Sequence, residues 1–312
     1  MENQTTLTYF VLLGFSYNLP VQIFLFLMFL FIYATTVLGN TVIITIITTN
    51  NHLRSPMYFF LSHLSFLDIC FSSVTLPNLL LNFYSSQTIS YSGCIAQMFL
   101  ILQSGWTEVY ILAAMAFDRY TAICKPLHYV QIMNRVFCRW LVGAAWVIGY
   151  MYSMVNSLPI LKLTFCGQNV IRHFSCEYPS LLALSCTETF LYVTTFFISG
   201  FTIGVSSSLV ILCSYVRIVS TVLKMQSAEA RKKTFSTCSA HLIVVILYYG
   251  TGCTRYMRPM SVSLAILDEL FSIQYSILTP MLNPIIYSLK TREIREALKK
   301  ILGYKPLTSC IA

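Results

Sequence analysis

Seven long apolar blocks run through the chain, and no other feature of the sequence constrains its fold as strongly. They cover about 22–48, 57–82, 95–122, 140–158, 191–219, 236–257 and 268–289. A helix of about 20 residues crosses the roughly 30 Å of hydrocarbon in a bilayer. Only 10% of the 312 residues are charged, against about a quarter in soluble domains. The sequence therefore predicts an all-α membrane protein, a seven-transmembrane helix bundle that forms a single domain over residues 1–312.

Lysine and arginine are distributed unevenly among the breaks between these blocks. If residues 1–21 are extracellular, 16 of the 20 cations face the cytoplasm, and only Lys162, Arg172, Arg255 and Arg258 lie outside. Cations resist translocation, so we expect a multi-pass plasma-membrane protein with an extracellular N-terminus and a cytoplasmic tail over 290–312. Residues 1–20 contain no cation that would begin a cleavable signal peptide, which favours an uncleaved first span. The net charge of +9 indicates contact with anionic membrane lipid, not with nucleic acid.

The segment after the seventh block is charged but periodic. Ile294, Leu298 and Ile301 follow one another at helical spacing among Lys, Arg and Glu. This pattern predicts a short amphipathic helix on the inner membrane surface, and the alternative is a solvated tail.

Two features of the expected outer segments agree with this orientation. Asn3-Gln4-Thr5 is a glycosylation sequon, which is usable only on the lumenal side. Four of the eleven cysteines, Cys94, Cys166, Cys176 and Cys186, also fall outside, where disulfides persist. Four cysteines allow three pairings, and their spacing does not choose among them.

Ionisable residues within the spans are few. Asp68 lies near the centre of the second block, and Glu108 lies on the third, eleven residues before Arg119. Charged groups at membrane depth are costly and usually functional. We expect Asp68 and Glu108 to form an acidic pair that shares a proton or holds a sodium ion, and the alternative is that neighbouring Ser, Asn or water satisfies each carboxyl.

Catalytic and metal-binding patterns are missing from the sequence. The five histidines are scattered among different segments, and no Cys/His spacing matches a zinc site. There is no P-loop, no Gly-x-Ser-x-Gly and no His-Glu-x-x-His motif. We therefore expect neither an enzyme nor a metal centre, and no cofactor other than the sodium ion considered above.

Six short motifs, in order along the chain, resemble those of one receptor family. They are Leu38-Gly39-Asn40, Pro56-Met57-Tyr58, the run from Met115 to Tyr129 around Asp118-Arg119-Tyr120, Ser214-Tyr215, Lys233 to Cys238 with His241, and Pro280 to Ser288. Together they resemble the class II (tetrapod) olfactory, or odorant, receptors among the rhodopsin-like G-protein-coupled receptors. Phe117, Thr121, Thr234 and Tyr248 depart from the family's usual Tyr, Val, Ala and Phe. None of these departures touches the Asp-Arg-Tyr core.

The resemblance implies two disulfides and an activation site. Cys94 would pair with Cys176, and Cys166 with Cys186. Arg119, paired with Asp118, would form a latch that opens on activation, and Pro284 would allow the seventh span to bend. The full set implied for activation and G-protein coupling is Asp118, Arg119, Tyr120, Tyr215, His241, Asn283, Pro284 and Tyr287. The partner implied is a stimulatory, olfactory-type G protein that raises cyclic AMP.

The resemblance also implies a ligand pocket in the outer half of the bundle. Its residues would be Met98, Leu102, Gly105, Trp106, Tyr178, Ser199, Ile203, Tyr249, Gly252, Cys253, Tyr256, Ile273 and Ser276. Such an apolar site suits a small, neutral, hydrophobic odorant. Receptors for amines need a carboxylate where Ile101 stands, and opsins need a lysine that 268–289 lacks. Two alternatives remain: a receptor for a metabolite outside the nose, and a transporter, which the odd number of spans and the lack of a repeat disfavour.

Overall fold

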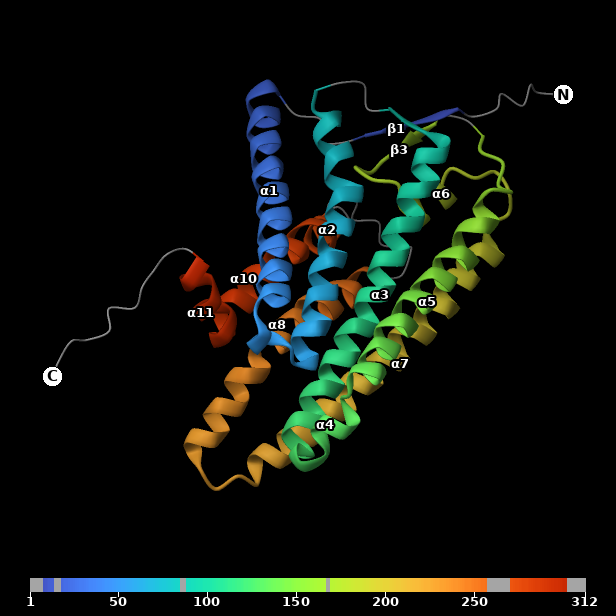
Figure 1. Cartoon of the computed structure of the whole chain (residues 1–312). Helices are drawn as coiled ribbons and strands as arrows, with labels where there is room; N and C mark the ends of the chain where they lie inside the picture. The colour runs from blue at the N-terminus through green and yellow to red at the C-terminus, as the bar shows by residue number, and fades with distance from the viewer. Residues whose placement is uncertain (1–7, 14–17, 85–87, 167–168, 257–269, 302–312) are drawn as a thin grey trace.

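The computed structural model describes residues 8–13, 18–84, 88–166, 169–256 and 270–301. Within these residues, six helices are long and apolar enough to cross a membrane. They are α1 (Leu19–Thr49), α2 (Pro56–Asn82), α3 (Tyr91–Cys124), α5 (Arg135–Ile160), α7 (Phe190–Leu223) and α8 (Ala228–Tyr256). In Figure 1, α1 stands upright, and α3, α5 and α7 are tilted against it.

The seventh helix of the bundle is interrupted. Residues 270–273 are helical, Gln274–Leu278 form a single π-helical turn (η3), and α10 continues over Thr279–Lys290. The amphipathic α11 (Arg292–Ile301) follows and contacts α1 and α10. Its Ile294 is buried, while Glu293 and Arg295 are exposed. The structure therefore has the predicted seven-helix bundle followed by a short amphipathic helix.

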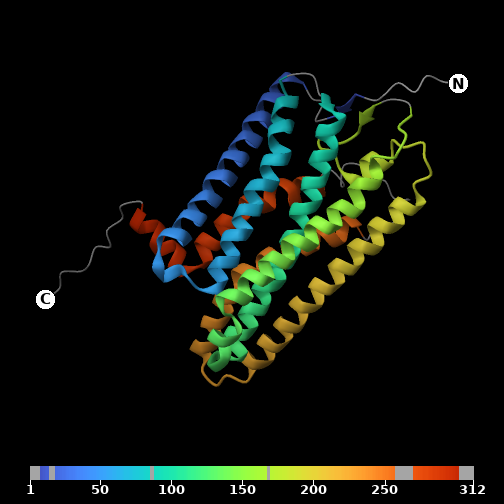
Figure 2. The ribbon, with the colours of Figure 1, turned by 45° about the vertical axis from the view of Figure 1, so that its right-hand side comes forward.

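Helix α3 occupies the centre of the bundle. It contacts α2, α5, α7 and α8, and a larger share of it is buried than of any other candidate span described. Helices α1 and α7 lie at opposite edges of the bundle (Figure 2), and only 17% of the apolar window of each is buried. Their outward side chains are apolar, among them Phe31 and Phe201, as expected for surfaces that face lipid.

Helix α8 begins at Ala228, well before the apolar block predicted from residue 236. Its first turns contain Glu229, Arg231 and Lys232, which are exposed. Hydropathy detects only the part of a helix that crosses hydrocarbon, whereas Ala, Glu, Arg and Lys favour helix in water as well. The helix therefore extends beyond the span.

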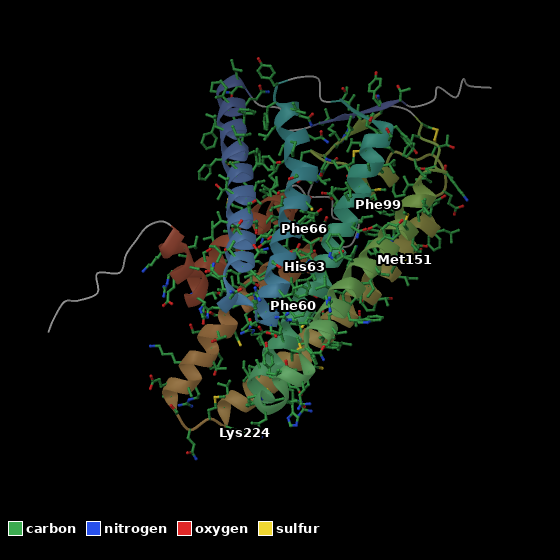
Figure 3. All side chains as sticks on the ribbon, in the orientation of Figure 1. Phe60, His63, Phe66, Phe99, Met151 and Lys224 are labelled. Atoms are coloured by element: carbon green, nitrogen blue, oxygen red, sulfur yellow. A yellow bond between two sulfur atoms is a disulfide. The ribbon has the colours of Figure 1, made fainter. Side chains whose placement is uncertain are left out.

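Figure 3 shows Lys224, at the turn between α7 and α8, at the end of the bundle opposite the N-terminus.

A small sheet covers the end of the bundle that carries the N-terminus, which we call the N-terminal face. Strand β1 (Tyr9–Leu12) lies between β2 (Thr88–Ser90), to which it is antiparallel, and β3 (Val170–Ile171), to which it is parallel. The buried ring of Phe10 packs against Tyr91 and Phe165, with centroid distances of 6.0 and 5.5 Å. Sequence analysis predicted no strand here, because strands of two to four residues leave no periodic pattern.

Short helices complete the described part of the chain. A 3-10 turn, η1 (Asn51–Leu53), joins α1 to α2, and η2 (Pro126–His128) leads into α4 (Tyr129–Ile132) between α3 and α5. Helix α6 (Tyr178–Leu182) lies in the connection between α5 and α7, on the N-terminal face. The turns η2 and α4 lie at the opposite end, which we call the opposite face.

Candidate functional site

An ion pair stands at the end of α3 on the opposite face. Arg119 lies 3.0 Å from the Oδ2 atom of Asp118, whose side chain is fully buried. Tyr129, on α4, donates a hydrogen bond of 2.8 Å to the other carboxylate oxygen. Burial and the neighbouring Asp118 raise the pKa of Tyr129, so this phenol stays a neutral donor. Two partners from separate elements therefore hold one buried carboxylate.

A second polar contact joins three helices near this pair. His241, on α8, is fully buried, and its Nδ1 atom lies 2.7 Å from the hydroxyl of Tyr215 on α7. Its Nε2 atom lies 3.0 Å from the carbonyl oxygen of Leu112 on α3. The rings of Tyr215 and His241 are stacked. Any movement of α8 away from α3 must break or replace the contact of the imidazole with Leu112.

The predicted acidic pair lies deeper in the bundle, beside α10. Asn283 donates to both carboxylate oxygens of Asp68, at 3.1 and 3.0 Å. Glu108 is close enough to interact electrostatically with Asp68, and it also contacts the amide of Asn283. The Oε1 atom of Glu108 and the Oδ1 atom of Asn283 are buried and have no hydrogen-bond partner in the part of the chain that the structure describes. The structure thus brings Asp68, Glu108 and Asn283 into one buried cluster, with Tyr287 nearby.

The bend expected at Pro284 has a specific partner on α1. Proline has no N–H, so the carbonyl four residues earlier, on Pro280, loses its partner within the helix. Asn40 donates to that carbonyl at 3.0 Å. The neighbouring Gly39 permits this approach, because a Cβ atom there would lie 3.1 Å from the ring of Pro284. Helix α1 thereby contacts α10 at both Pro280 and Pro284.

An aromatic cluster occupies the N-terminal half of the bundle between α3, α5, α6 and α7. The ring of Trp106 lies 4.7 Å from Tyr152, Tyr152 lies 6.2 Å from Phe196, and Phe196 is stacked on Tyr178 at 4.5 Å. The predicted pocket residues Met98, Leu102 and Ile203 pack in the same apolar cluster. Burial and the nearby Tyr192 raise the pKa of Tyr178 to about 12. We call Trp106, Tyr152, Phe196 and Tyr178 the aromatic wall.

Two tyrosines of α8 connect the predicted pocket to neighbouring helices. Tyr248 donates a hydrogen bond of 2.7 Å to the carbonyl oxygen of Gly105, and a Cβ atom at Gly105 would lie 3.4 Å from the same hydroxyl. Tyr249 donates to the hydroxyl of Ser207 on α7 at 2.8 Å. Gly105 and Tyr249 therefore lie on the sides of α3 and α8 that face into the bundle.

The remaining predicted pocket residues lie in different surroundings, and one of them, Ser199, contacts the aromatic wall through the carbonyl of Phe196 at 3.3 Å. Ile273 packs with α1 and α2 in a separate cluster around Phe29. Ser276 donates to the carbonyl of Ser272 one turn earlier, and Ser199 is bonded to α5 through Asn156. A Cβ atom at Gly252 would meet nothing within 4 Å. Cys253 and Tyr256 have side chains outside the described residues, as does the predicted sequon at Asn3.

The connection between α5 and α7 is fixed over α3 by two disulfides and a buried amide. Cys94 is bonded to Cys176, and Cys166 to Cys186. Gln97 accepts a hydrogen bond from the backbone N–H of Cys176 at 2.9 Å and donates to the carbonyl of Val74 at 2.8 Å. One side chain on α3 therefore positions both α2 and the loop.

A buried polar network continues from this loop to the seventh helix. His173 lies 3.1 Å from the hydroxyl of Ser272 and 3.7 Å from the carboxylate of Glu177. Tyr275 donates to the same carboxylate at 3.0 Å. His173, Glu177 and Ser272 are all buried. The loop thus has polar contacts with the seventh helix as well as with α3.

Comparison with known proteins gives one consistent family. The model for "Olfactory receptor" matches residues 29–305. The human olfactory receptor 5A1 is 47% identical over 308 residues, which cover 98% of each chain. The human olfactory receptor 2K2 is 45% identical and covers 97% of this chain and 96% of its own. The chain belongs to the olfactory receptor family. A crystal structure of squid rhodopsin superposes on this receptor with a TM-score of 0.70 at 17% identity, covering 94% of this chain and 88% of that one, which shows the shared seven-helix fold.

Membership confirms several predictions from the sequence. The receptor is a multi-pass membrane protein of the G-protein-coupled type, with a small ligand and a G protein as its partners. Its relatives are receptors and not enzymes, as expected from the absence of catalytic motifs. The role of each site residue stays a prediction.

Sequence analysis gave no role to several residues that the structure places beside the predicted ones. Tyr152 and Phe196 complete the aromatic wall, and Tyr129 holds Asp118. Tyr152 lies four residues before Asn156 on the buried side of α5, so the helical period of α5 was the one signal available for it. Tyr129 lies in a polar connection, where no period indicates a partner on α3.

Proposed function

We propose that this receptor binds a small, neutral, hydrophobic odorant in the N-terminal half of its bundle and activates a stimulatory heterotrimeric G protein, which raises cyclic AMP. The main support is the separation of two kinds of site along α3. Leu102 and Trp106 belong to an apolar, aromatic cluster, whereas Asp118 and Arg119 form an ion pair at the other end of the same helix. Both sites therefore include residues of the same continuous helix, α3.

Helix α8 connects these two sites because it has polar contacts with α3 near each of them. Tyr248 is bonded to the carbonyl of Gly105, and His241, about two turns away, is bonded to the carbonyl of Leu112. A ligand shifts a receptor only if it binds one of two packings more tightly. An odorant that binds more tightly when the bond between Tyr248 and Gly105 is broken favours a packing in which α8 moves away from α3.

The opposite face has the properties of a surface that binds a cytoplasmic partner. Leu127 is 91% exposed and Val130 is 79% exposed on the connection between α3 and α5, outside the predicted spans. An open hollow of about 500 Å³ is formed by residues between Cys124 and Ile132. Exposed apolar side chains here, together with the exposed cations Arg231 and Lys232 in the first turns of α8, suit an amphipathic partner helix. We place this face in the cytosol and the N-terminus outside the plasma membrane.

The cluster of Asp68, Glu108 and Asn283 suits a sodium ion. Two carboxylates and an amide carbonyl supply oxygen ligands, the kind that hard cations take. Two of these oxygens have no hydrogen-bond partner within the described segments. Bound sodium would supply positive charge between Asp68 and Glu108. Basal cyclic AMP should then depend on external sodium in the unmodified receptor and lose that dependence in Asp68→Asn. Retained dependence in Asp68→Asn would contradict the assignment.

Substitution of Gly105 tests the proposed function most directly. Because a Cβ atom at this position already contacts the hydroxyl of Tyr248, the ring in Gly105→Phe fills the space between α3 and α8. Responses to a broad panel of volatile odorants should disappear, while antibody staining of an N-terminal epitope on intact cells stays unchanged. Gly143→Phe is the matched control, since Gly143 lies on α5 with nothing within 4 Å of its Cβ position. Unchanged odorant responses in Gly105→Phe would exclude this pocket.

A further inference from the structure

Asn156 has a buried hydrogen-bond acceptor that no group in the described part of the chain satisfies. This residue lies on α5, and its side chain is 1% exposed. Its amide nitrogen donates to the carbonyl of Tyr152 at 2.9 Å and contacts the hydroxyl of Ser199 on α7 at 3.5 Å. The Oδ1 atom is buried without a hydrogen-bond partner among the described residues. Because the nitrogen is engaged with a carbonyl, the orientation of the amide is fixed, and the free atom is the acceptor.

This acceptor stands at the edge of the aromatic wall. Tyr152, which receives the Asn156 amide, lies one turn earlier on α5 and contacts Trp106 and Phe196. Ser199 is followed on α7 by Gly200, where a Cβ atom would lie 3.2 Å from the hydroxyl of Tyr152 and 3.4 Å from the ring of Trp106. The same short stretch of α7 therefore touches both the amide of Asn156 and the aromatic rings.

Ser199 holds the amide but does not satisfy the acceptor. Its hydroxyl donates to the carbonyl of Thr195 at 2.6 Å, so its hydrogen points along α7 and not toward Asn156. The contact with the Asn156 nitrogen uses a lone pair of the hydroxyl oxygen. Ser199 is thus a positioning residue, and the Oδ1 atom of Asn156 stays available to a donor from elsewhere.

We propose that the Oδ1 atom of Asn156 is the polar anchor of the odorant pocket and selects ligands that carry a hydroxyl on an apolar or aromatic body. A carbonyl oxygen accepts but cannot donate, so alcohols and phenols pair with it, whereas ethers and hydrocarbons leave it unsatisfied. An ammonium ligand would lose its hydration in this site and would find no anion to pair with, because the amide is neutral. The aromatic wall supplies the surface for the apolar body. This inference rests on the proposed function as an odorant receptor.

Matched sets of odorants test the anchor in cells that express the full-length receptor. One set is benzyl alcohol, benzyl methyl ether and toluene, and a second is 1-octanol, its methyl ether and octane. Activation is followed by cyclic AMP, and binding by the shift in melting temperature of the purified receptor. The alcohol should be about tenfold or more stronger in potency than its ether, since a site built for a hydroxyl penalises analogues that lack it.

Variants then assign the preference to a single atom. Asn156→Leu should lower the potency of the alcohol to that of its ether and leave the ether within about threefold of its original value. The control is Gln103→Leu, which removes another buried carbonyl oxygen that has no hydrogen-bond partner among the residues described. Gln103 lies between α3 and α5, beside the carbonyl of Trp146 and outside the aromatic wall, so this variant should keep the preference for the alcohol.

The outcomes separate this inference from the proposed function on which it rests. Equal potency of alcohol and ether in the unmodified receptor overturns the anchor, as do responses confined to aldehydes or esters, and neither result affects the odorant role. If Asn156→Leu still responds better to the alcohol than to its ether, the anchor is overturned as well. If that variant fails to reach the surface, the comparison in the unmodified receptor decides alone. No response and no thermal shift with any volatile of a broad panel would overturn the proposed function itself.

Discussion

The amide of Asn40 donates to the carbonyl oxygen of Pro280 at 3.0 Å, and this bond joins the first helix to the seventh. Asn40 thereby supplies the hydrogen bond that Pro284 cannot, because its nitrogen bears no hydrogen. The seventh helix can keep a proline near its centre because a side chain 240 residues away in sequence satisfies the freed carbonyl.

This relationship predicts that Asn40 and Pro284 are energetically coupled. Asn40→Leu leaves the Pro280 carbonyl unpaired, which costs about 1–3 kcal/mol of stability. In a Pro284→Ala background the new N–H can take over, so the same substitution should cost less than about 1 kcal/mol. A double-mutant cycle on the detergent-solubilised receptor measures the difference. Equal losses in the two backgrounds would show that Asn40 acts through packing alone.

A second prediction concerns the close contact of α3 and α5. A Cβ atom at Gly149 would overlap the hydroxyl of Thr107 and lie 3.0 Å from the carbonyl of Gln103. Gly149→Ala should therefore destabilise the receptor by about 1–3 kcal/mol through overpacking. Melting curves recorded at one scan rate provide the measurement, because unfolding of such proteins is often irreversible.

The control for this substitution lies on the same helix. Gly143 is exposed, and its Cβ position has nothing within 4 Å. Gly143→Ala should be neutral or slightly stabilising, because alanine favours helix by about 1 kcal/mol over glycine. A similar loss in both variants would mean that helix α5, and not its contact with α3, is sensitive to substitution.

A third prediction uses the departure at Tyr248, where the family usually has phenylalanine. In this structure Arg119 is paired with Asp118, and the hydroxyl of Tyr248 on α8 donates a hydrogen bond to the carbonyl of Gly105 on α3. One such bond contributes about 0.5–1.5 kcal/mol, so Tyr248→Phe should raise basal cyclic AMP by roughly two- to tenfold per receptor at the surface. Tyr248→Trp, which keeps a donor but not its position, should not restore the low basal value. A basal signal unchanged in Tyr248→Phe would show that this bond is equally strong in both packings.

The parts of the fold that sequence could predict are those that follow from local composition. The seven apolar blocks coincide with helices because hydrocarbon requires every backbone group to bond within its own segment. Helix α11 was predicted because Ile294 and Leu298 repeat at helical spacing. Neither prediction requires information about which residues lie next to the helix in space.

The contacts that complete the candidate sites depend on tertiary neighbours and could not be predicted in this way. Asn156 and Tyr152 are ordinary residues of an apolar helix until α7 is placed against them. Strand β1 pairs with segments that are far away in the chain. The resemblance placed Ile273 in the pocket, and its packing with Phe29 could not be predicted, because a family position does not specify the side-chain direction in one member.

The last prediction concerns Tyr129, the second partner of Asp118. Tyr129→Phe removes a hydrogen bond of 2.8 Å to a buried carboxylate, a contact of the kind that contributes about 1.5–3 kcal/mol. Tyr129 is only half-buried, so water recovers part of this, and we expect basal cyclic AMP to rise about threefold. If Tyr129 acts only through this carboxylate, adding Tyr129→Phe to Asp118→Asn should produce no further rise. Tyr150→Phe, on the exposed side of α5 beside Phe99, serves as the control and should leave basal activity unchanged. A further rise in the double variant would show that Tyr129 acts on the receptor by a route other than the Asp118–Arg119 pair.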